Sequence, residues 1–292
     1  MIYVICGPTG SGKTSTAIKV AEKLDAPIIN ADAFQVYKEM IVGTAKISQN
    51  HPAYKRHYLL DILSPEEAFS IKEYQELFRE CIDSLLQKYE NVVICGGTGL
   101  YIRASLFDYV FEEHEPDDTT DLEKMSNEDL WSMLQKLDEG ATKTIHPNNR
   151  KRVIRAISIA RTGSMLKSEN IENQKHEMIY KDVRVMMINP DRQMLYNNIN
   201  ERVDEMFSNG LIEEVKNLIN KYNLSLTAKQ AIGYKEVIDY LEGKTSLENC
   251  VEIIKQRTRN YAKRQVTFFK HQFECEMYDS PKQLLEELKI YE

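Results

Sequence analysis

The chain has 292 residues, of which 42% are hydrophobic and 28% are charged, so it can bury one large core and a smaller one. The formal net charge of −7 excludes a protein that is basic over its whole surface, although basic residues can still gather in one place. The five cysteines form no CxxC pair, which argues against a zinc site or a disulfide framework and favours a reducing cytoplasm. No run approaches the roughly 18 apolar residues of a membrane span, and we expect no leader sequence.

The first part of the chain alternates between predicted strands and helices. Apolar runs predict strands at residues 2–6, 27–30 and 91–95, and helical spacing predicts helices at 15–24, at 70–89 and from Leu100 onward. Ser70 is a candidate cap for the second of these helices. Strands that alternate with helices indicate a parallel α/β sheet with right-handed crossovers.

The composition changes after the third strand. Residues 112–139 are strongly acidic, whereas residues 142–167 contain lysine and arginine and no acid. The apolar spacing is helical at 130–137, and residues 183–192 indicate a return to the buried sheet. We therefore predict the first part of the α/β core at 1–113, a helical insertion at 114–182, and the completion of the core with basic C-terminal helices at 183–292. Helices are expected there at 195–222, 229–241 and 246–273.

A phosphate-binding pattern lies between the first strand and the first helix. Gly7-Pro8-Thr9-Gly10-Ser11-Gly12-Lys13-Thr14 matches GxxxxGK[ST]. Such a loop (the P-loop) curls backbone N–H groups around phosphate oxygens at a helix N-terminus, while the lysine reaches the terminal phosphate and the threonine hydroxyl ligates Mg²⁺. An ordinary glycine-rich turn is disfavoured, because strand and helix flank the motif as required. The motif predicts a diphosphate or triphosphate and does not name the molecule.

A second glycine-rich turn, Gly96-Gly97-Thr98-Gly99, follows the third strand. A typical ATPase commonly has a metal-holding aspartate at this point, and this chain has none. The segment is either a tight turn from strand to helix or a second backbone wall of the phosphate site. Both interpretations stay open.

Asp32 follows the second strand and should face the same crevice as the P-loop, because ligands of open α/β sheets bind beyond the carboxyl ends of the strands. A lone aspartate after a strand most often caps a turn. Beside a phosphate loop, however, a carboxylate is repelled by the ligand unless it has a role. It can hold Mg²⁺ or take a proton from an acceptor substrate. Both roles suit a transferase.

Two basic stretches lie at residues 149–155 and 253–273. Each places cations one helical turn apart, on Lys151 and Arg155 in the first and on Lys255, Arg259 and Lys263 in the second. A solvated helix face explains either stretch alone, but two such stretches in an acidic chain favour a polyanionic partner. Aromatic residues interleaved with the second stretch could stack on bases.

With these features together, the chain resembles the tRNA dimethylallyltransferases, also called tRNA isopentenyltransferases. The matching segments follow the family's order through nearly the whole chain: GPTGSGKT, ADAFQVY, VGTAK, GGTGLY, HPNNRKRVIRA, INERVDEM, KQAIGYKE and RNYAKRQVTFF. The resemblance implies a P-loop NTPase-like parallel sheet flanked by helices, with an inserted small helical domain and a helical C-terminal region.

The resemblance also implies an activity and partners. The family transfers a dimethylallyl group from dimethylallyl diphosphate to N6 of the adenosine on the 3′ side of the anticodon, giving N6-isopentenyladenosine. Mg²⁺ is the implied cofactor, and the anticodon stem-loop of tRNA is the implied partner. A membrane is not expected to take part, and we expect a cytoplasmic monomer.

Site residues are implied in the same way. Asp32 would be the general base, Thr98 would lie beside the reacting groups, and Arg202 would stabilise the departing diphosphate held by residues 7–14, with Thr14 on Mg²⁺. The tRNA contacts would be made by Asp32, Ala33, Phe34, Gln35, Thr98, Lys151, Arg152, Val153, Ile154, Arg155, Arg259 and Lys263. Ala33 and Phe268 stand where the family usually has serine and tryptophan, and neither change removes a group from the mechanism.

Three other functions remain open at this point. An adenylate isopentenyltransferase would add the same group to free AMP, ADP or ATP, and would not need the basic insertion. A P-loop kinase for a nucleotide or metabolite would need only the P-loop and Asp32. A non-catalytic RNA-binding protein would have no use for Lys13 and Thr14 opposite Asp32.

Overall fold

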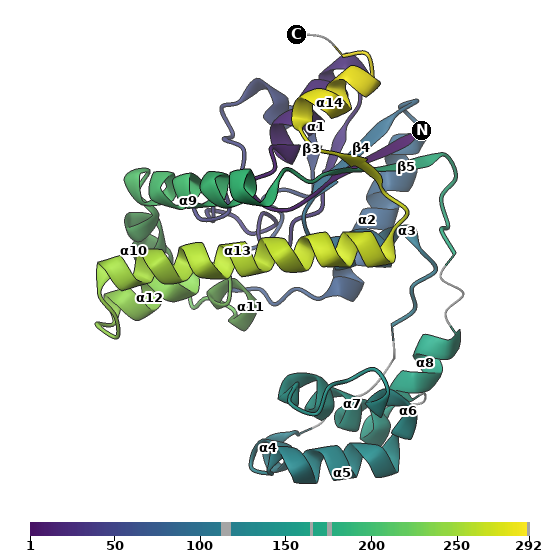
Figure 1. Ribbon diagram of the computed structural model, residues 1–292, viewed down its shortest axis with the longest axis vertical. Coiled ribbons are helices and arrows are strands. Elements are labelled where there is room, and N and C mark those ends of the chain that lie inside the picture. Colours follow the sequence, from purple (N-terminus) through teal and green to yellow (C-terminus); the bar gives the residue numbers. More distant parts are fainter. Residues whose placement is uncertain (112–117, 164–165, 174–176, 291–292) are drawn as a thin grey trace. The chain divides into compact units, whose positions relative to one another are not determined.

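The computed structural model describes residues 1–111, 118–163, 166–173 and 177–290 (Figure 1). The chain divides into two compact units. The first, here the core unit, comprises Met1–Ser105 and Tyr180–Glu292, and the second, here the helical unit, comprises Leu106–Ile179. The predicted boundary between residues 113 and 114 lies outside the described residues.

The core unit is built on a six-stranded sheet with the order β3-β2-β4-β1-β5-β6. Its strands are β1 (Ile2–Cys6), β2 (Ile28–Asn30), β3 (His57–Tyr58), β4 (Val92–Gly96), β5 (Val183–Ile188) and β6 (Glu276–Tyr278). Every pairing is parallel, so the predicted parallel α/β sheet is confirmed. β3 and β6 were not predicted, because these short edge strands are partly exposed and are not apolar runs.

The strands β1, β2 and β4 and most of β5 are buried on both faces, which explains why they read as continuous apolar runs. β1 is central, with Ile2 opposite Val92 on one side and opposite Val183 on the other. The helices α1 (Lys13–Lys23) and α14 (Pro281–Glu287) pack on the sheet through one apolar cluster. The predicted helix at 70–89 is α2 (Ile71–Leu86), which begins at a capping box formed by Ser70 and Glu73. The helix expected after the second glycine turn is α3 (Gly99–Leu106).

The C-terminal helices differ from the prediction in number. The prediction of a single helix at 195–222 is wrong. Two helices occupy this range, because α9 (Arg192–Ser208) ends before Gly210 and α10 (Leu211–Lys221) follows it. Gly210 has φ of 90°, a conformation that glycine adopts without strain and that ends a helix. The helix expected at 229–241 is likewise divided into α11 (Leu226–Lys229) and α12 (Tyr234–Leu241).

The long helix α13 (Leu247–Gln272) confirms the third C-terminal prediction. Figure 1 shows it running beside α9 and α12. It packs on α9 through Leu195, Ile199 and Ala262. The carboxyl ends of the central strands point to one edge of the core unit, and α13 lies along that edge. No helix within the described ranges is long and apolar enough to span a bilayer.

The helical unit has its own core. It contains α4 (Thr120–Glu123), α5 (Asn127–Leu137), α6 (Glu139–Thr142), α7 (Arg150–Thr162) and α8 (Lys167–Asn173). Leu122, Leu130, Leu134, Val153 and Ile157 are buried together inside it. The chain enters and leaves the unit through paired segments, with Phe107 opposite Met178 in an antiparallel bridge.

Candidate active site

The carboxyl ends of three adjacent strands form one edge of the core unit. β2, β4 and β1 are neighbours in the sheet, and they lead into Asp32, the second glycine turn and the P-loop respectively. A pocket opens at this edge, as expected for an open α/β sheet. Its polar lining includes Thr9, Lys13, Thr14, Asn30, Asp32, Gln35 and Arg202.

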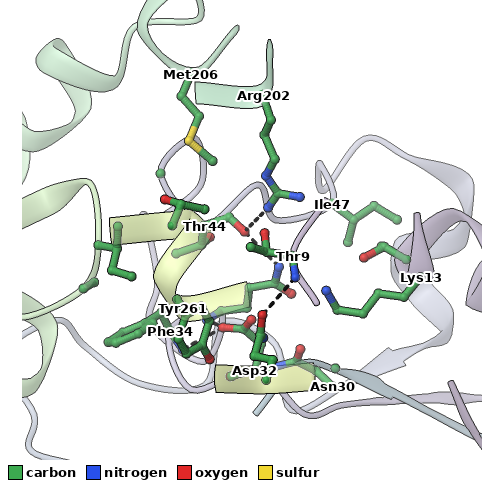
Figure 2. Close-up of a pocket in the computed structure, with 18 of the residues that line it drawn as sticks. Thr9, Lys13, Asn30, Asp32, Phe34, Thr44, Ile47, Arg202, Met206 and Tyr261 are labelled. Atoms are coloured by element: carbon green, nitrogen blue, oxygen red, sulfur yellow. Dashed lines mark hydrogen bonds between the residues drawn. The ribbon is translucent and has the colours of Figure 1, made fainter. Parts of the chain in front are cut away.

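Two cationic side chains enter the pocket from different elements. Figure 2 shows Lys13 of α1 and Arg202 of α9 pointing into the space beside Thr9, with Asp32 on the opposite side. Burial lowers the pKa of Lys13, and its Nζ donates a hydrogen bond only to the carbonyl of Pro8, at 3.3 Å, within the described part of the chain. An anion bound here would favour the charged form of the lysine and so oppose the effect of burial.

Arg202 is incompletely paired. Its Nη2 donates to the carbonyl of Thr44 at 3.5 Å, and its Nε is buried without a hydrogen-bond partner in the structure. Burial lowers the pKa of Arg202, and the negative charge of Asp32 partly offsets this effect. A buried guanidinium N–H that faces a pocket is a ready donor for an anionic ligand.

The two carboxylate oxygens of Asp32 lie in different environments. Its Oδ1 accepts hydrogen bonds from the backbone N–H groups of Phe34, at 2.9 Å, and Gln35, at 3.3 Å, so it caps the turn after β2. Its Oδ2 has no protein partner among the described residues, and the half-buried carboxylate lines the pocket. One oxygen holds the turn, and the other is left for a ligand.

The second glycine turn packs closely against α13. Gln265 of α13 accepts a hydrogen bond from the N–H of Thr9 at 2.9 Å and donates one to the carbonyl of Gly97 at 2.9 Å. A Cβ on Gly97 would come within 2.2 Å of the Gln265 Nε2 atom. The glycine is therefore needed for this close approach, and Gln265 joins the P-loop to the second turn.

Thr98 holds the segment that carries Asp32. Its Oγ1 accepts a hydrogen bond from the N–H of Ala33 at 3.1 Å, and its own N–H donates to the carbonyl of Ala31 at 3.1 Å. Burial raises the pKa of the nearby Tyr261 to about 12. Thr98 is thus beside Asp32.

Apolar side chains form another part of the pocket wall, among them Phe34, Ile47, Val203, Met206, Ile232 and Ile254. Sequence reasoning missed most of these residues, and it missed Gln265. The available signal for Gln265 was its position one helical turn after Tyr261 on the inner face of α13. A pocket that is cationic in one part and apolar in another suits a ligand that is both anionic and hydrocarbon.

The residues predicted to bind tRNA fall in different environments. Lys151, Arg152 and Arg155 are exposed on α7. Val153 lies between them in sequence, but it is 1% exposed and packs in the core of the helical unit, so its side chain is not on the surface. Ile154 is partly buried against the same core.

The second basic stretch is partly neutralised. On α13, Lys255 pairs with Asp204 at 2.7 Å, and Arg257 pairs with Glu236. Arg259 donates to Asn200 Oδ1 at 2.6 Å. Lys263 is exposed, as are Arg264 and Lys270, and none of the three forms an ion pair with another described residue.

Comparisons with known proteins agree with the resemblance. A family model described as IPP transferase matches residues 35–272. A tRNA dimethylallyltransferase of Bacillus licheniformis is 41% identical over 284 residues, which cover 95% of this chain and 90% of that protein. A tRNA dimethylallyltransferase of Anoxybacillus flavithermus is 39% identical over an alignment that covers 100% of this chain and 94% of that protein.

Solved structures are similar over almost all of the chain. A tRNA delta(2)-isopentenylpyrophosphate transferase from Staphylococcus epidermidis superposes with a TM-score of 0.71 at 37% identity, covering 99% of this chain and 97% of that one. A eukaryotic dimethylallyltransferase described as acting on tRNA gives a TM-score of 0.73 at 26% identity, covering 98% of this chain and 75% of the other. This chain therefore belongs to the tRNA dimethylallyltransferase family and is a prenyltransferase.

Proposed function

We propose that this protein transfers a dimethylallyl group from dimethylallyl diphosphate to N6 of the adenosine on the 3′ side of a tRNA anticodon. The observation that carries the proposal is the composition of one pocket, which joins Lys13 and Arg202, the carboxylate of Asp32 and an apolar wall. The diphosphate, the acceptor amine and the hydrocarbon chain each need one of these three surfaces.

The P-loop and the two cations hold the diphosphate in this mechanism. When the allylic C–O bond breaks, negative charge grows on the bridging oxygen of the leaving diphosphate. That charge is stabilised by backbone N–H groups at the start of α1, by Lys13 and by the unpaired Nε of Arg202. These groups stabilise the charge of the transition state more strongly than they stabilise the charge of the bound substrate. Bond cleavage is thereby made easier without a covalent intermediate on the protein.

The residues of the pocket fit a magnesium ion that is brought in with the diphosphate. The Thr14 hydroxyl would supply a hard oxygen ligand, and no cluster of three or more histidine, cysteine or acidic side chains occurs within the described ranges. Mg²⁺ commonly uses one or two protein oxygens and completes its shell with substrate phosphates and water. When bound, it would neutralise part of the leaving-group charge.

Asp32 is the proposed general base. The lone pair of an adenine amine is delocalised into the ring, so the amine attacks carbon poorly until a proton acceptor engages its N–H. The free Oδ2 of Asp32 is such an acceptor, and Thr98 fixes the turn that carries it. In the reaction the N6–C bond forms, the C–O bond to diphosphate breaks, and the amine proton passes to Asp32.

The acceptor base must leave the anticodon loop to reach this pocket. Apolar side chains such as Phe34, Met206 and Ile232 would surround the base and the dimethylallyl chain and keep water from capturing the cationic carbon. The exposed cations of α7, with Arg259 and Lys263 of α13, are the proposed tRNA contacts. A monomer in the cytoplasm is part of the same proposal.

Mass spectrometry of nucleosides from digested tRNA tests the function. Unmodified tRNA with adenosines next to its anticodon is incubated with the protein, Mg²⁺ and dimethylallyl diphosphate, and AMP is offered in a parallel reaction. We expect one adenosine per tRNA to gain the mass of one dimethylallyl group. Prenylated AMP with unchanged tRNA would contradict the proposal and identify a free nucleotide as the acceptor.

A further inference from the structure

Glu214 on α10 accepts hydrogen bonds from three successive backbone N–H groups of one loop. Its Oε2 accepts from Ile41 at 3.1 Å and Val42 at 2.7 Å, and its Oε1 accepts from Gly43 at 3.2 Å. The hydroxyl of Tyr234 donates to the same Oε1 at 2.6 Å. Successive backbone N–H groups that converge in this way form a concave anion site, and here the anion is the protein's own carboxylate.

The segment held by Glu214, here the 41–47 loop, forms part of the pocket wall. Gly43, Thr44 and Ile47 line the pocket. The carbonyl of Thr44 accepts hydrogen bonds from two pocket side chains, Gln35 Nε2 at 3.0 Å and Arg202 Nη2 at 3.5 Å. Figure 2 shows Arg202 reaching towards Thr44. This carbonyl is therefore the contact through which the 41–47 loop orients the guanidinium.

A second anchor holds the far end of the loop. Lys46 is buried and forms an ion pair with Asp61 at 2.5 Å. Its Nζ also donates to the carbonyl of Tyr37. Thr44 thus lies between two fixed points, Glu214 on one side and Lys46 on the other, so a shift at Glu214 must move the Thr44 carbonyl.

We propose that Glu214 is a positioning residue for diphosphate binding, which it assists through the Thr44 carbonyl and Arg202. The inference rests on the proposed role of Arg202 in holding the diphosphate. A carboxylate is required because four N–H or O–H donors converge on two oxygens. A glutamine of the same size offers one acceptor oxygen and one NH₂ group, so at least one loop N–H would face another donor and the loop would move.

Binding of inorganic diphosphate, measured by calorimetry on the full chain with Mg²⁺, tests the inference. Four proteins are compared: the unaltered chain, Glu214→Gln, Arg202→Ala, and the two changes together. We expect Glu214→Gln to weaken binding by about tenfold, as for one misplaced charge-assisted hydrogen bond. In the Arg202→Ala background the same change should have no further effect, because the group it positions is gone.

Glu213→Gln is the matched control, since Glu213 is the exposed neighbour of Glu214 and the change removes the same charge. It should bind diphosphate as the unaltered chain does. Tyr234→Phe is the second variant, because it removes one donor from the Glu214 carboxylate and leaves the 41–47 loop sequence intact. It should weaken binding in the same direction by a smaller factor, and again only while Arg202 is present.

The outcomes separate this inference from the proposed function. If Arg202→Ala weakens binding but Glu214→Gln has no effect, or has an equal effect in both backgrounds, Glu214 does not act through Arg202 and the inference is wrong. If Arg202→Ala itself leaves diphosphate binding unchanged, the proposed role of Arg202 fails, and the inference fails with it.

Discussion

The two carboxylate oxygens of Asp32 separate its contact with the backbone from its proposed role as the base. Oδ1 accepts the N–H groups of Phe34 and Gln35, and Oδ2 is left facing the pocket. An alanine at this position would therefore disturb both functions at once. The variant that separates them is the asparagine, whose side-chain oxygen can replace Oδ1 while its NH₂ group cannot accept a proton.

We predict that Asp32→Asn lowers the single-turnover rate of prenyl transfer by about 100-fold or more, the usual contribution of a general base. The dissociation constants for tRNA and for inorganic diphosphate should change little, because the turn and the basic surface remain. Asp32→Ala is the comparison, and it should keep tRNA binding but lose most turnover, because the basic surface stays while the proton acceptor is removed. A normal rate in the asparagine variant would show that Asp32 is not the base.

At the scale of elements, α13 joins the two loops that form the phosphate side of the pocket. Gln265 bonds to Thr9 in the P-loop and to Gly97 in the second glycine turn, although it lies far from both in sequence. This side chain is 5% exposed, and its amide makes both bonds inside the protein. The position of α13 therefore determines how the P-loop and the second turn face each other.

We predict that Gly97→Ala destabilises the protein by about 1–3 kcal/mol, because the new methyl group would overlap the Gln265 amide. The backbone of Gly97 does not have the positive φ that would strain alanine, so the cost arises from packing alone. Thermal unfolding would measure it. Adding Gln265→Ala to Gly97→Ala should recover part of the lost melting temperature. If the two changes are simply additive, the predicted overlap is wrong.

At the scale of the whole molecule, an acidic chain presents separate cationic surfaces. The net charge is −7, yet Lys151, Arg152 and Arg155 are all exposed on one helix. On the same helix Arg161 is already engaged by Asp121, at 2.9 Å. The cations of α7 are therefore not equivalent as candidates for tRNA phosphates, even though they look alike in sequence.

We predict that replacing Arg152 and Arg155 together by alanine weakens tRNA binding by about tenfold or more. The slope of log K for tRNA binding against log salt concentration should become shallower by about 1–2. Binding of inorganic diphosphate should not change. Arg161→Ala is the control on the same helix and should have a smaller effect, since its charge is already paired. Unchanged tRNA affinity in the double variant would exclude these residues as phosphate contacts.

The sequence by itself determined the parts of this protein that depend on neighbours along the chain. The P-loop, with β1 before it and α1 after it, could be predicted because spacing and glycine content are local properties. The parallel sheet followed from apolar runs separated by helical patterns. The position of Asp32 at a strand end followed from the same rule.

Only the tertiary structure decided which distant groups meet. Glu214 bonds to Val42 across 172 positions, and Gln265 bonds to Thr9 across 256, and neither pairing leaves a local pattern. The resemblance implied Val153 as a tRNA contact together with its neighbours in sequence, but packing places its side chain in the core of the helical unit. Local spacing reports the form of an element, whereas contacts between elements depend on how their buried faces fit together.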